Sequence, residues 1–567
     1  MPALRSVLLP VALLPLLARC GPVHVRDTDE SLMHPKIACQ ARSKRDISYN
    51  IREKDADFWR ARAREQLETT LEREPLRQVA RSAVLFLGDG MSVPTLAAAR
   101  ILLGQRYGLP GEEAQLSFER FPYAGLSKTY CVDAQVADSA CSSTAYLCGV
   151  KANTGTMGVT AAVRRGDCRA QNNTANHVDS ILKWAQAAGK ATGIVTTSRV
   201  THASPGGGYA HIADREWEND ADVSAAGADP AVCPDIASQL VTAEPGRNLK
   251  VIMGGGRREF RPKTSDDEEE GGKGRRKDGR DLIEEWKADK SRRGSSSKYV
   301  WNKDQLLQND TVAADYILGL FEDSHMQYHL DANPETEPRL WEMTEVAIRA
   351  LQKEPNGFIL FVEGARIDMA HHSNRAHKAL DETIEFSEAI RVADQLTDER
   401  DTLLVVTADH AHTMSFNGYP ARGNDILGDA GTDEEKLSYT TLSYANGPGY
   451  QKPGKNCQRP DIREDDKSEK NYRFRGMVPL GSETHGGDDV AVLSRGPWSH
   501  LLTGVFEQNY IAHAMAYATC VGDGLTACND KRSTSGRRGG LTSTPGYDIP
   551  FREEHRYEVP AVYSPNG

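Results

Sequence analysis

Six short runs of apolar residues, rich in Val, Ile and Leu, recur along this 567-residue chain. Each is followed by an acidic or glycine-rich turn and then by a segment with helical spacing of apolar residues. Runs that are apolar on both faces are typical of parallel strands, because helices cover both sides of a parallel sheet. The six runs lie at residues 83–87, 192–197, 249–253, 358–362, 403–407 and 490–493. This alternation predicts an α/β protein with a doubly wound, largely parallel central sheet flanked by helices.

The charge balance excludes one broad class of function. The chain carries 69 Lys and Arg residues against 80 Asp and Glu residues, a formal net charge of −11. Proteins whose main task is to bind a nucleic-acid backbone need a strongly basic surface. We therefore expect no nucleic-acid-binding role.

The N-terminus has the pattern of a secretory signal. Arg5 precedes an apolar run over residues 7–17 and a small-x-small cleavage site at Ala18-Arg19-Cys20. We expect residues 1–20 to be a signal peptide and the protein to be secreted or extracellular. Residues 558–567 lack the hydrophobic tail of a lipid-anchor signal, so we expect cell-surface attachment only if such a tail is missing from the sequence.

Several segments differ in composition from the sheet pattern. Residues 21–50 are polar and contain Arg42-Ser43-Lys44-Arg45, which resembles a furin-type cleavage site but equally suits a solvated basic run. The first alternative makes residues 21–50 a propeptide. The expected division of the remaining chain is a single domain over 51–530, with a charged surface excursion at 263–298 and an inserted lobe at 415–482, and a polar tail over 531–567.

Two features agree with an extracellular location. Ten cysteines in an exported chain predict disulfides, although their number does not give the pairing. Two N-x-S/T sequons predict glycosylation at Asn172 and Asn309.

Acidic and imidazole side chains follow three of the predicted strands. The carboxyl ends of parallel strands meet at one edge of the sheet, so these side chains should lie together. Asp368 and His372 share one helical face, which suits a metal ion but also an ordinary surface ion pair. Charged groups directly after an apolar strand are costly to leave unpaired. A multinuclear metal site is therefore predicted from Asp89, Glu363, Asp368, His372, Asp409, His410 and His485. Mixed imidazole and carboxylate ligands suit zinc, and oxygen ligands suit magnesium.

Ser139 is the candidate nucleophile. It stands in Asp138-Ser139-Ala140, before an apolar helical stretch at 145–150, and so near a helix N-terminus that favours an anion. The simpler alternative is a helix-capping serine. The G-x-S-x-G elbow of triad hydrolases is absent here, so a metal would have to activate the hydroxyl.

Six motifs together resemble those of the animal-type alkaline phosphatases, over about residues 50–530. They are Phe86-Leu87-Gly88-Asp89-Gly90-Met91, Asp138-Ser139-Ala140 with 144–151, His202-Ala203-Ser204-Pro205, Val362-Glu363-Gly364-Ala365-Arg366-Ile367-Asp368, Thr407-Ala408-Asp409-His410 and Glu483-Thr484-His485.

The resemblance implies two zinc ions, one magnesium ion and a calcium ion. One zinc would lie on Asp368, His372 and His485, the second on Asp89, Asp409 and His410 beside Ser139, and magnesium on Asp89, Ser204 and Glu363 near His202. Arg215 would bind the substrate phosphate, because its guanidinium can donate two parallel hydrogen bonds. His412 would orient a zinc ligand. Calcium would lie on Glu268, the Phe321 carbonyl, Glu322 and Glu337, although Glu268 belongs to an acidic run that also suits a solvated loop.

The resemblance further implies disulfides Cys168–Cys233 and Cys520–Cys528. It implies a homodimer clasped by N-terminal arms, each formed by a helix around residues 55–59, with 415–482 as the crown-like lobe that faces the partner. The chain departs from the family at Met369, where animal members commonly have histidine.

The expected activity is hydrolysis of phosphate monoesters at alkaline pH through a covalent phosphoserine. A phosphodiesterase or sulfatase relative with the same metal core is one alternative, which the Asp-Ser pair and the complete magnesium set disfavour. An inactive metal-binding homologue is the other, and the presence of every ligand and of the nucleophile disfavours it.

Overall fold

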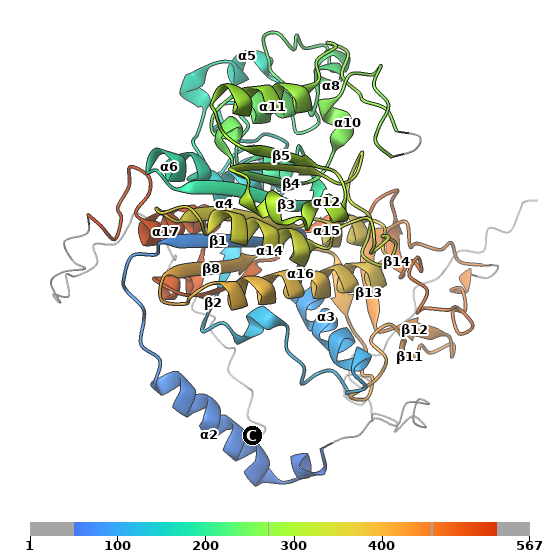
Figure 1. Cartoon of the computed structure of the whole chain (residues 1–567). Helices are drawn as coiled ribbons and strands as arrows, with labels where there is room; N and C mark the ends of the chain where they lie inside the picture. Colours follow the sequence, from blue (N-terminus) through green and yellow to red (C-terminus); the bar gives the residue numbers. More distant parts are fainter. Residues whose placement is uncertain (1–49, 270–271, 455–456, 530–567) are drawn as a thin grey trace, which may run out of the picture. The chain divides into compact units, whose positions relative to one another are not determined.

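A ten-stranded sheet forms the centre of the protein (Figure 1). The computed structural model describes residues 50–529 except 270–271 and 455–456, so the expected signal peptide, the 42–45 cleavage site and the 531–567 tail lie outside the described residues. In spatial order the strands are β17 (Gly504–Glu507), β2 (Tyr123–Lys128), β16 (Val490–Arg495), β8 (Thr402–Thr407), β1 (Ser82–Gly88), β7 (Phe358–Gly364), β3 (Ala191–Arg199), β4 (Val251–Gly255), β6 (Tyr316–Leu320) and β5 (Ser297–Val300).

The predicted fold class is confirmed. The seven strands from β8 to β5 are parallel, and β16 runs antiparallel to β8 and to β2. All six predicted runs are strands of this sheet. Four strands were not predicted: β2, β5, β6 and β17. All four lie at or next to the edges of the sheet. Strands β2 and β17 expose part of their side chains and so lack a fully apolar pattern.

Strand β1 shows why the central runs are apolar throughout. Val84 and Phe86 point into one core, whereas Leu85 and Leu87 point into the other. Helices α3 (Val93–Arg106), α14 (Leu340–Leu351) and α16 (Ala376–Leu396) cover the first face, with α14 and α16 in front of the sheet in Figure 1. Helices α4 (Ser139–Cys148), α6 (Ile181–Ala187), α9 (Ile236–Thr242) and α17 (Tyr510–Thr519) cover the second. The sheet is therefore buried on both sides, as in other doubly wound proteins.

Helix α2 (Ala56–Leu71) has no buried residue and is drawn well apart from the sheet (Figure 1). Trp59 is 51% exposed and Leu67 is 57% exposed. The preceding turn η1 (Ile51–Lys54) is linked to the lobe by an ion pair between Glu53 and Arg422.

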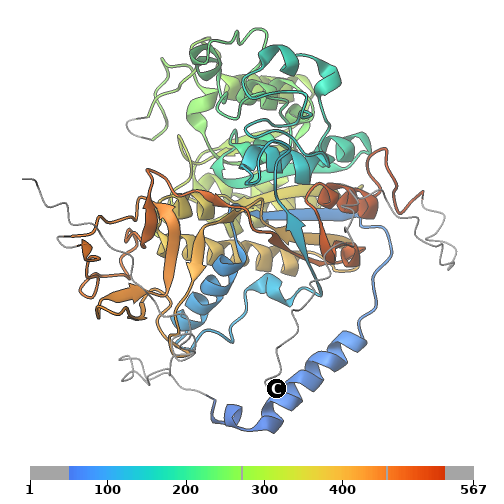
Figure 2. The same cartoon turned by 180° about the vertical axis from the view of Figure 1, so that it is seen from behind.

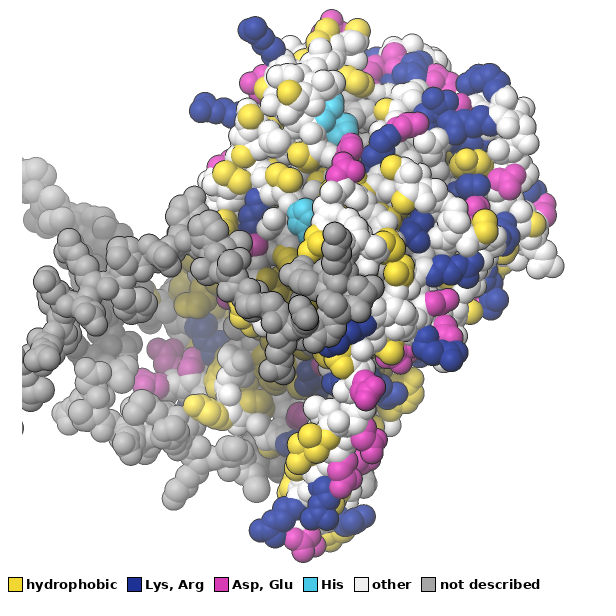
Figure 3. All heavy atoms as spheres, turned by 90° about the vertical axis from the view of Figure 1, so that its left-hand side faces the viewer, with side chains coloured by type: hydrophobic (Ala, Val, Ile, Leu, Met, Phe, Trp, Pro, Cys, Tyr) yellow, Lys and Arg dark blue, Asp and Glu magenta, His cyan; other side chains and the backbone are white. Residues whose placement is uncertain are grey.

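The 415–482 region contains two small sheets, seen in orange at the edge of Figure 2. One is built from β10 (Met414–Phe416), β13 (Leu442–Gly447) and β14 (Gly476–Pro479), and the other from β11 (Asp429–Thr432) and β12 (Ser438–Thr440). On the face drawn in Figure 3, Lys and Arg side chains are interspersed with Asp and Glu. Within the described residues, no helix combines the length and apolar character needed to cross a bilayer.

The expected surface excursion at 263–298 is only partly correct. Its second half forms α11 (Leu282–Arg292) and the start of β5, and Leu282, Ile283 and Trp286 are buried in the second core. Their helical spacing is hidden in the sequence by the charged residues on the opposite face of α11.

Three disulfides lie in the described part of the chain. Cys168–Cys233 and Cys520–Cys528 are the pairs that the family resemblance implied, and Cys131–Cys141 was not expected.

Candidate active site

The metal-type side chains meet at the carboxyl edge of the central strands. Asp89 follows β1, Glu363 lies in β7, and Asp409 with His410 follows β8. Asp368 and His372 lie on the short helix α15 (Arg366–His372) after β7, and the paired short strands β9 (Ala411–His412) and β15 (His485–Gly486) place His485 opposite His412. The topology therefore brings together residues that are up to about four hundred positions apart.

One cluster consists of Asp368, His372 and His485. The two Nε2 atoms are 3.1 Å apart, and they lie 3.4 Å (His372) and 3.3 Å (His485) from Oδ1 of Asp368. Nδ1 of His372 donates to the Glu483 carbonyl and Nδ1 of His485 to the Ala137 carbonyl. In the neutral rings both Nε2 atoms then carry lone pairs that face each other, which is unfavourable unless a cation lies between them. The spacing is close to the ~3.3 Å expected between ligands of a tetrahedral ion with bonds of about 2.0 Å.

A second cluster surrounds Ser139. Oγ of Ser139 is 3.2 Å from Nε2 of His410, and the same nitrogen is 3.0 Å from Asp409 and 3.6 Å from Asp89. All four side chains are buried. Ser139 is the first residue of α4, and Asp138 is its N-cap.

The oxygen-rich part of the site lies around Glu363. Oε2 of Glu363 accepts hydrogen bonds from Thr196 and Ser198. Oε1 of Glu363 and both oxygens of Asp89 are buried and accept no hydrogen bond from a described residue. Ser204, in the turn α7 (Ala203–Gly206) after β3, is also buried. Buried carboxylate oxygens without donors fit a bound cation.

The carboxylates repel one another in the absence of such a cation. Burial, together with the carboxylates of Asp409, Asp368 and Glu363, raises the pKa of Asp89 well above its usual range. Burial also raises the pKa of Glu363 to about 7. Divalent ions would keep these groups ionised at neutral pH, so the nitrogen and oxygen donor sets both fit metal binding.

Arg215 lies beside the nucleophile segment. Its Nη1 donates to Oδ2 of Asp138 at 3.0 Å, and its Nη2 is 3.2 Å from Nε2 of His202. Burial and the adjacent Arg215 lower the pKa of His202 to about 3, so this histidine is neutral.

Glu483 belongs to the motif Glu483-Thr484-His485 but was not among the predicted site residues. Glu483 accepts a hydrogen bond from Nδ1 of His412 at 2.5 Å, and Nε2 of His412 is 2.7 Å from Asp368. Burial alone would lower the pKa of His412, but its hydrogen bonds to Asp368 and Glu483 outweigh burial and raise it to about 10. The carboxylate–histidine–carboxylate chain holds Asp368 in place.

The candidate calcium residues are brought together only in part. Burial and the nearby Glu322 carboxylate raise the pKa of Glu337 to about 8, and the charge of Glu269 contributes as well. Glu268 instead accepts a hydrogen bond from Tyr299 at 3.0 Å and forms an ion pair with Arg261. Phe321 is buried directly before Glu322. The charge that acts on Glu337 and Glu322 from the acidic run is therefore that of Glu269 and not that of Glu268.

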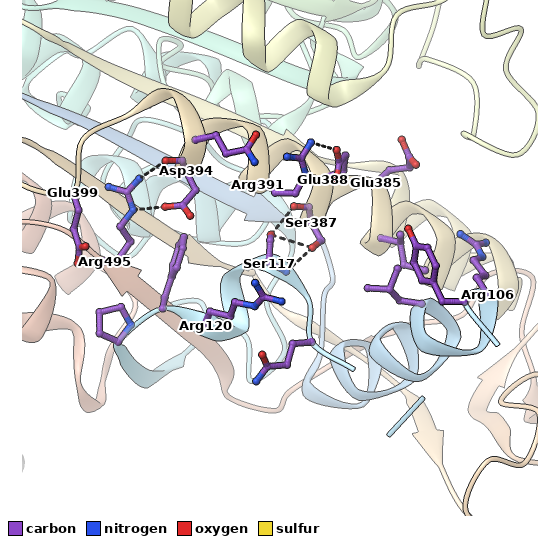
Figure 4. A pocket seen from close by; sticks show the side chains of 17 residues that line it. Arg106, Ser117, Arg120, Glu385, Ser387, Glu388, Arg391, Asp394, Glu399 and Arg495 are labelled. Carbon is purple, nitrogen blue, oxygen red and sulfur yellow. Dashed lines mark hydrogen bonds and ion pairs between the residues drawn. The ribbon is translucent and has the colours of Figure 1, made fainter. Parts of the chain in front are cut away.

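A surface cavity of about 950 Å³ lies elsewhere, between α3, the turn η2 (Ser117–Arg120) and α16 (Figure 4). Its lining contains ion pairs such as Arg495–Asp394 and includes none of the predicted site residues.

A family model and several curated relatives match this chain. The family model described as alkaline phosphatase matches residues 80–521. A membrane-bound alkaline phosphatase of Bombyx mori is 54% identical over 483 residues, covering 84% of this chain and 87% of the relative. The human tissue-nonspecific alkaline phosphatase is 49% identical over 484 residues, covering 84% and 91%.

Solved structures show the same fold. The alkaline phosphatase of the Antarctic bacterium TAB5 has a TM-score of 0.54 at 20% identity, covering 79% of this chain and 100% of that one. The Thermus thermophilus alkaline phosphatase has a TM-score of 0.55 at 22% identity, covering 79% and 93%. From the family match and the high identity to animal relatives, the chain belongs to the alkaline phosphatase family and is an enzyme that hydrolyses phosphate monoesters.

Proposed function

We propose that the enzyme hydrolyses phosphate monoesters at alkaline pH through a covalent phosphoserine on Ser139, at a site that holds two zinc ions and one magnesium ion. The observation that carries this proposal is the position of the Ser139 hydroxyl, 3.2 Å from His410 in a buried cluster with Asp89 and Asp409. A lone serine hydroxyl is a weak nucleophile, and this cluster is the means of activating it.

The ligand types in each cluster indicate which metal ion it would hold. One zinc would be held by Asp368, His372 and His485, and the other by Asp89, Asp409 and His410. Magnesium would be held by the oxygens of Asp89, Ser204 and Glu363, with His202 nearby. When bound, these ions would lower the pKa of the serine hydroxyl and of a water molecule and would neutralise phosphate oxygens.

The chain's own residues then perform two displacements. Oγ of Ser139 attacks phosphorus and its proton passes to solvent. The bond from phosphorus to the leaving oxygen breaks, and the alcohol departs with a proton taken from solvent. Water next attacks the phosphoserine, releasing inorganic phosphate and restoring the hydroxyl. Arg215 would bind two phosphate oxygens with its guanidinium and neutralise charge in the transition state. His412 and Glu483 keep Asp368 oriented throughout.

The proposal also covers the location, glycosylation, oligomeric state and calcium site of the protein. The protein would be secreted or held at the cell surface, glycosylated at Asn172 and Asn309, and assembled as a homodimer. The exposed helix α2, with its uncovered Trp59 and Leu67, supports an arm that packs on a second copy. A calcium ion would lie near Phe321, Glu322 and Glu337, with Glu268 or its neighbour Glu269 as the remaining ligand.

Substitution of the nucleophile tests the proposal. Ser139→Ala should abolish steady-state turnover of a chromogenic phosphomonoester while leaving the zinc content unchanged, because the protein ligands and not the hydroxyl fix the metals. The matched control is Ser143→Ala, one turn further along α4, whose hydroxyl only donates to the Ala140 carbonyl and whose loss should leave turnover unchanged. Full turnover in Ser139→Ala would refute the proposal.

A further inference from the structure

The unexpected disulfide Cys131–Cys141 encloses the nucleophile. It joins the segment that leaves β2 to the third residue of α4, with a sequence separation of 10. Ala137, Asp138 and Ser139 all lie inside the ring that it closes. The bond therefore constrains the part of the backbone that carries the proposed phosphoserine.

Three residues of the ring make the contacts that define the site. The Ala137 carbonyl accepts a hydrogen bond from Nδ1 of His485 at 2.7 Å. Asp138 accepts from Arg215 at 3.0 Å, and Ser139 Oγ lies 3.2 Å from His410. The ring thus touches a residue of each metal cluster and the phosphate-binding arginine.

Apart from the disulfide, this segment buries little apolar surface. Of residues 130–136, only Cys131 is buried. The two half-cystines, each 2% exposed, form a small apolar cluster whose other buried members are Ala137 and Ala152, apart from both main cores. Alanines bury little apolar area, so they stabilise the loop weakly. Hydrogen bonds also hold the segment: Val132 N–H donates to the Ala152 carbonyl, Thr154 donates to Asp133, Nζ of Lys151 donates to the Tyr130 carbonyl, and Gly155 N–H donates to Asp138.

We propose that the Cys131–Cys141 disulfide is a positioning element for catalysis, which holds Ala137, Asp138 and Ser139 in register with His485, Arg215 and His410. The inference rests on the proposed function in one respect, that Ser139 is the nucleophile. Displacement of a nucleophile by about 1 Å can cost on the order of a hundredfold in rate, so a looser loop should slow phosphorylation.

The chain provides a matched control. Cys520–Cys528, at the end of α17, has a sequence separation of 8, and none of its residues touches the site described above. Disulfides that close loops of similar length stabilise a protein by similar amounts in the chain-entropy model. The double variants Cys131→Ser/Cys141→Ser and Cys520→Ser/Cys528→Ser should therefore lose comparable stability and differ in catalysis.

The experiment measures the rate constant of phosphoserine formation by rapid acid quench, with Zn²⁺ and Mg²⁺ saturating and at a temperature well below both thermal midpoints. We expect at least a tenfold decrease in Cys131→Ser/Cys141→Ser and less than a twofold change in the Cys520→Ser/Cys528→Ser control. A rate constant within twofold of the parent's in the first variant, or an equal decrease in both variants, would overturn the inference.

A second measurement covers the case in which the first variant does not fold. The native enzyme is treated with a water-soluble phosphine, which donates two electrons to each disulfide. Water supplies two protons to the two thiols that form and the oxygen of the phosphine oxide. Alkylation and peptide mapping then give the reduced fraction of each bond. We expect activity loss to follow reduction of Cys131–Cys141 and not of Cys520–Cys528. Full activity after complete reduction of Cys131–Cys141 would overturn the inference.

Failure of the nucleophile assignment and failure of the disulfide's role give different results. If Ser139→Ala keeps full turnover, the nucleophile assignment fails whatever the disulfide variants do. If Ser139→Ala is inactive and Cys131→Ser/Cys141→Ser phosphorylates at the parent's rate, only the role of the disulfide fails.

Discussion

Arg215 donates from Nη1 to Oδ2 of Asp138 at 3.0 Å, so the cation assigned to the substrate phosphate is paired with the residue that precedes the nucleophile. Both side chains are mostly buried, at 17% and 16% exposure. Burial opposes ionisation of Asp138, but Arg215 and backbone N–H donors outweigh it and keep its pKa below the usual range. The guanidinium is therefore held in place before a phosphate arrives, which lowers the entropy cost of binding.

Replacing Arg215 should weaken phosphate recognition. Hydrogen bonds to charged groups are worth roughly 1.5–3 kcal/mol, so we expect Arg215→Ala to lower kcat/KM by about 10- to 100-fold. Arg165→Ala is the control, because Arg165 pairs with Asp214 and is 47% exposed. Steady-state kinetics of both variants on one phosphomonoester provide the measurement. An unchanged kcat/KM in Arg215→Ala would contradict the assigned role.

Removal of metal should abolish activity reversibly. Imidazole-containing and all-oxygen donor sets select different ions, so we expect Zn²⁺ and Mg²⁺ together to restore a chelated enzyme better than either ion alone. Activity and metal content are measured through chelation, dialysis and re-addition. Full activity in metal-stripped protein would contradict the account, and full recovery with Mg²⁺ alone would show that zinc is the wrong metal.

The Glu322–Glu337 pair should make stability depend on pH and calcium. The folded-state pKa of Glu337 is raised to about 8, above the ordinary glutamate value near 4.5, so the native state keeps a proton that the unfolded state releases. In chelated protein, this group should therefore make stability fall as pH rises from about 4.5 to 8, by at most about 1.4 kcal/mol per pH unit.

Added Ca²⁺ should reverse this loss, and the rise in thermal midpoint should be larger at pH 8.5 than at pH 6, because the metal displaces the proton. The Glu337→Gln variant lacks the titrating group and serves as the comparison in calorimetry. The same Ca²⁺ effect in both proteins at both pH values would argue against a calcium site here.

Met369 should make the enzyme release phosphate more readily. Its sulfur accepts a hydrogen bond from Nη1 of Arg366 at 2.8 Å, and the side chain cannot donate to a phosphate or to a bridging water. We expect weaker inhibition by inorganic phosphate and a higher turnover number in the parent than in Met369→His, with the largest difference near neutral pH. Met369→Leu, which keeps the apolar bulk, should behave like the parent. Equal inhibition constants for the parent and Met369→His at neutral pH would show that Met369 only packs.

The sequence predicted those site residues that come shortly after strands of the central sheet. Asp89, Asp368 and Asp409 each come directly after an apolar run or within a few residues of its end, and parallel topology then brings them to one edge. It could not give Glu483 a role, because that residue acts through His412, which lies seventy-one positions earlier in the chain. The pairing of Cys131 with Cys141 likewise depends on the path of the loop between β2 and α4, which spacing alone does not define. Trp286 was missed as a core residue because charged residues surround it in the sequence.

The most direct test of the central claim is to trap the covalent intermediate. The holoenzyme is mixed with a phosphomonoester, quenched in acid within the first turnover and digested, and the phosphorylated peptides are mapped by mass spectrometry. The account predicts phosphate on Ser139, in the peptide that spans Asp138 and Ala140, and its absence in Ser139→Ala. Turnover at the normal rate with phosphate on another residue, or with no phosphopeptide under conditions where chemistry outpaces hydrolysis, would contradict it.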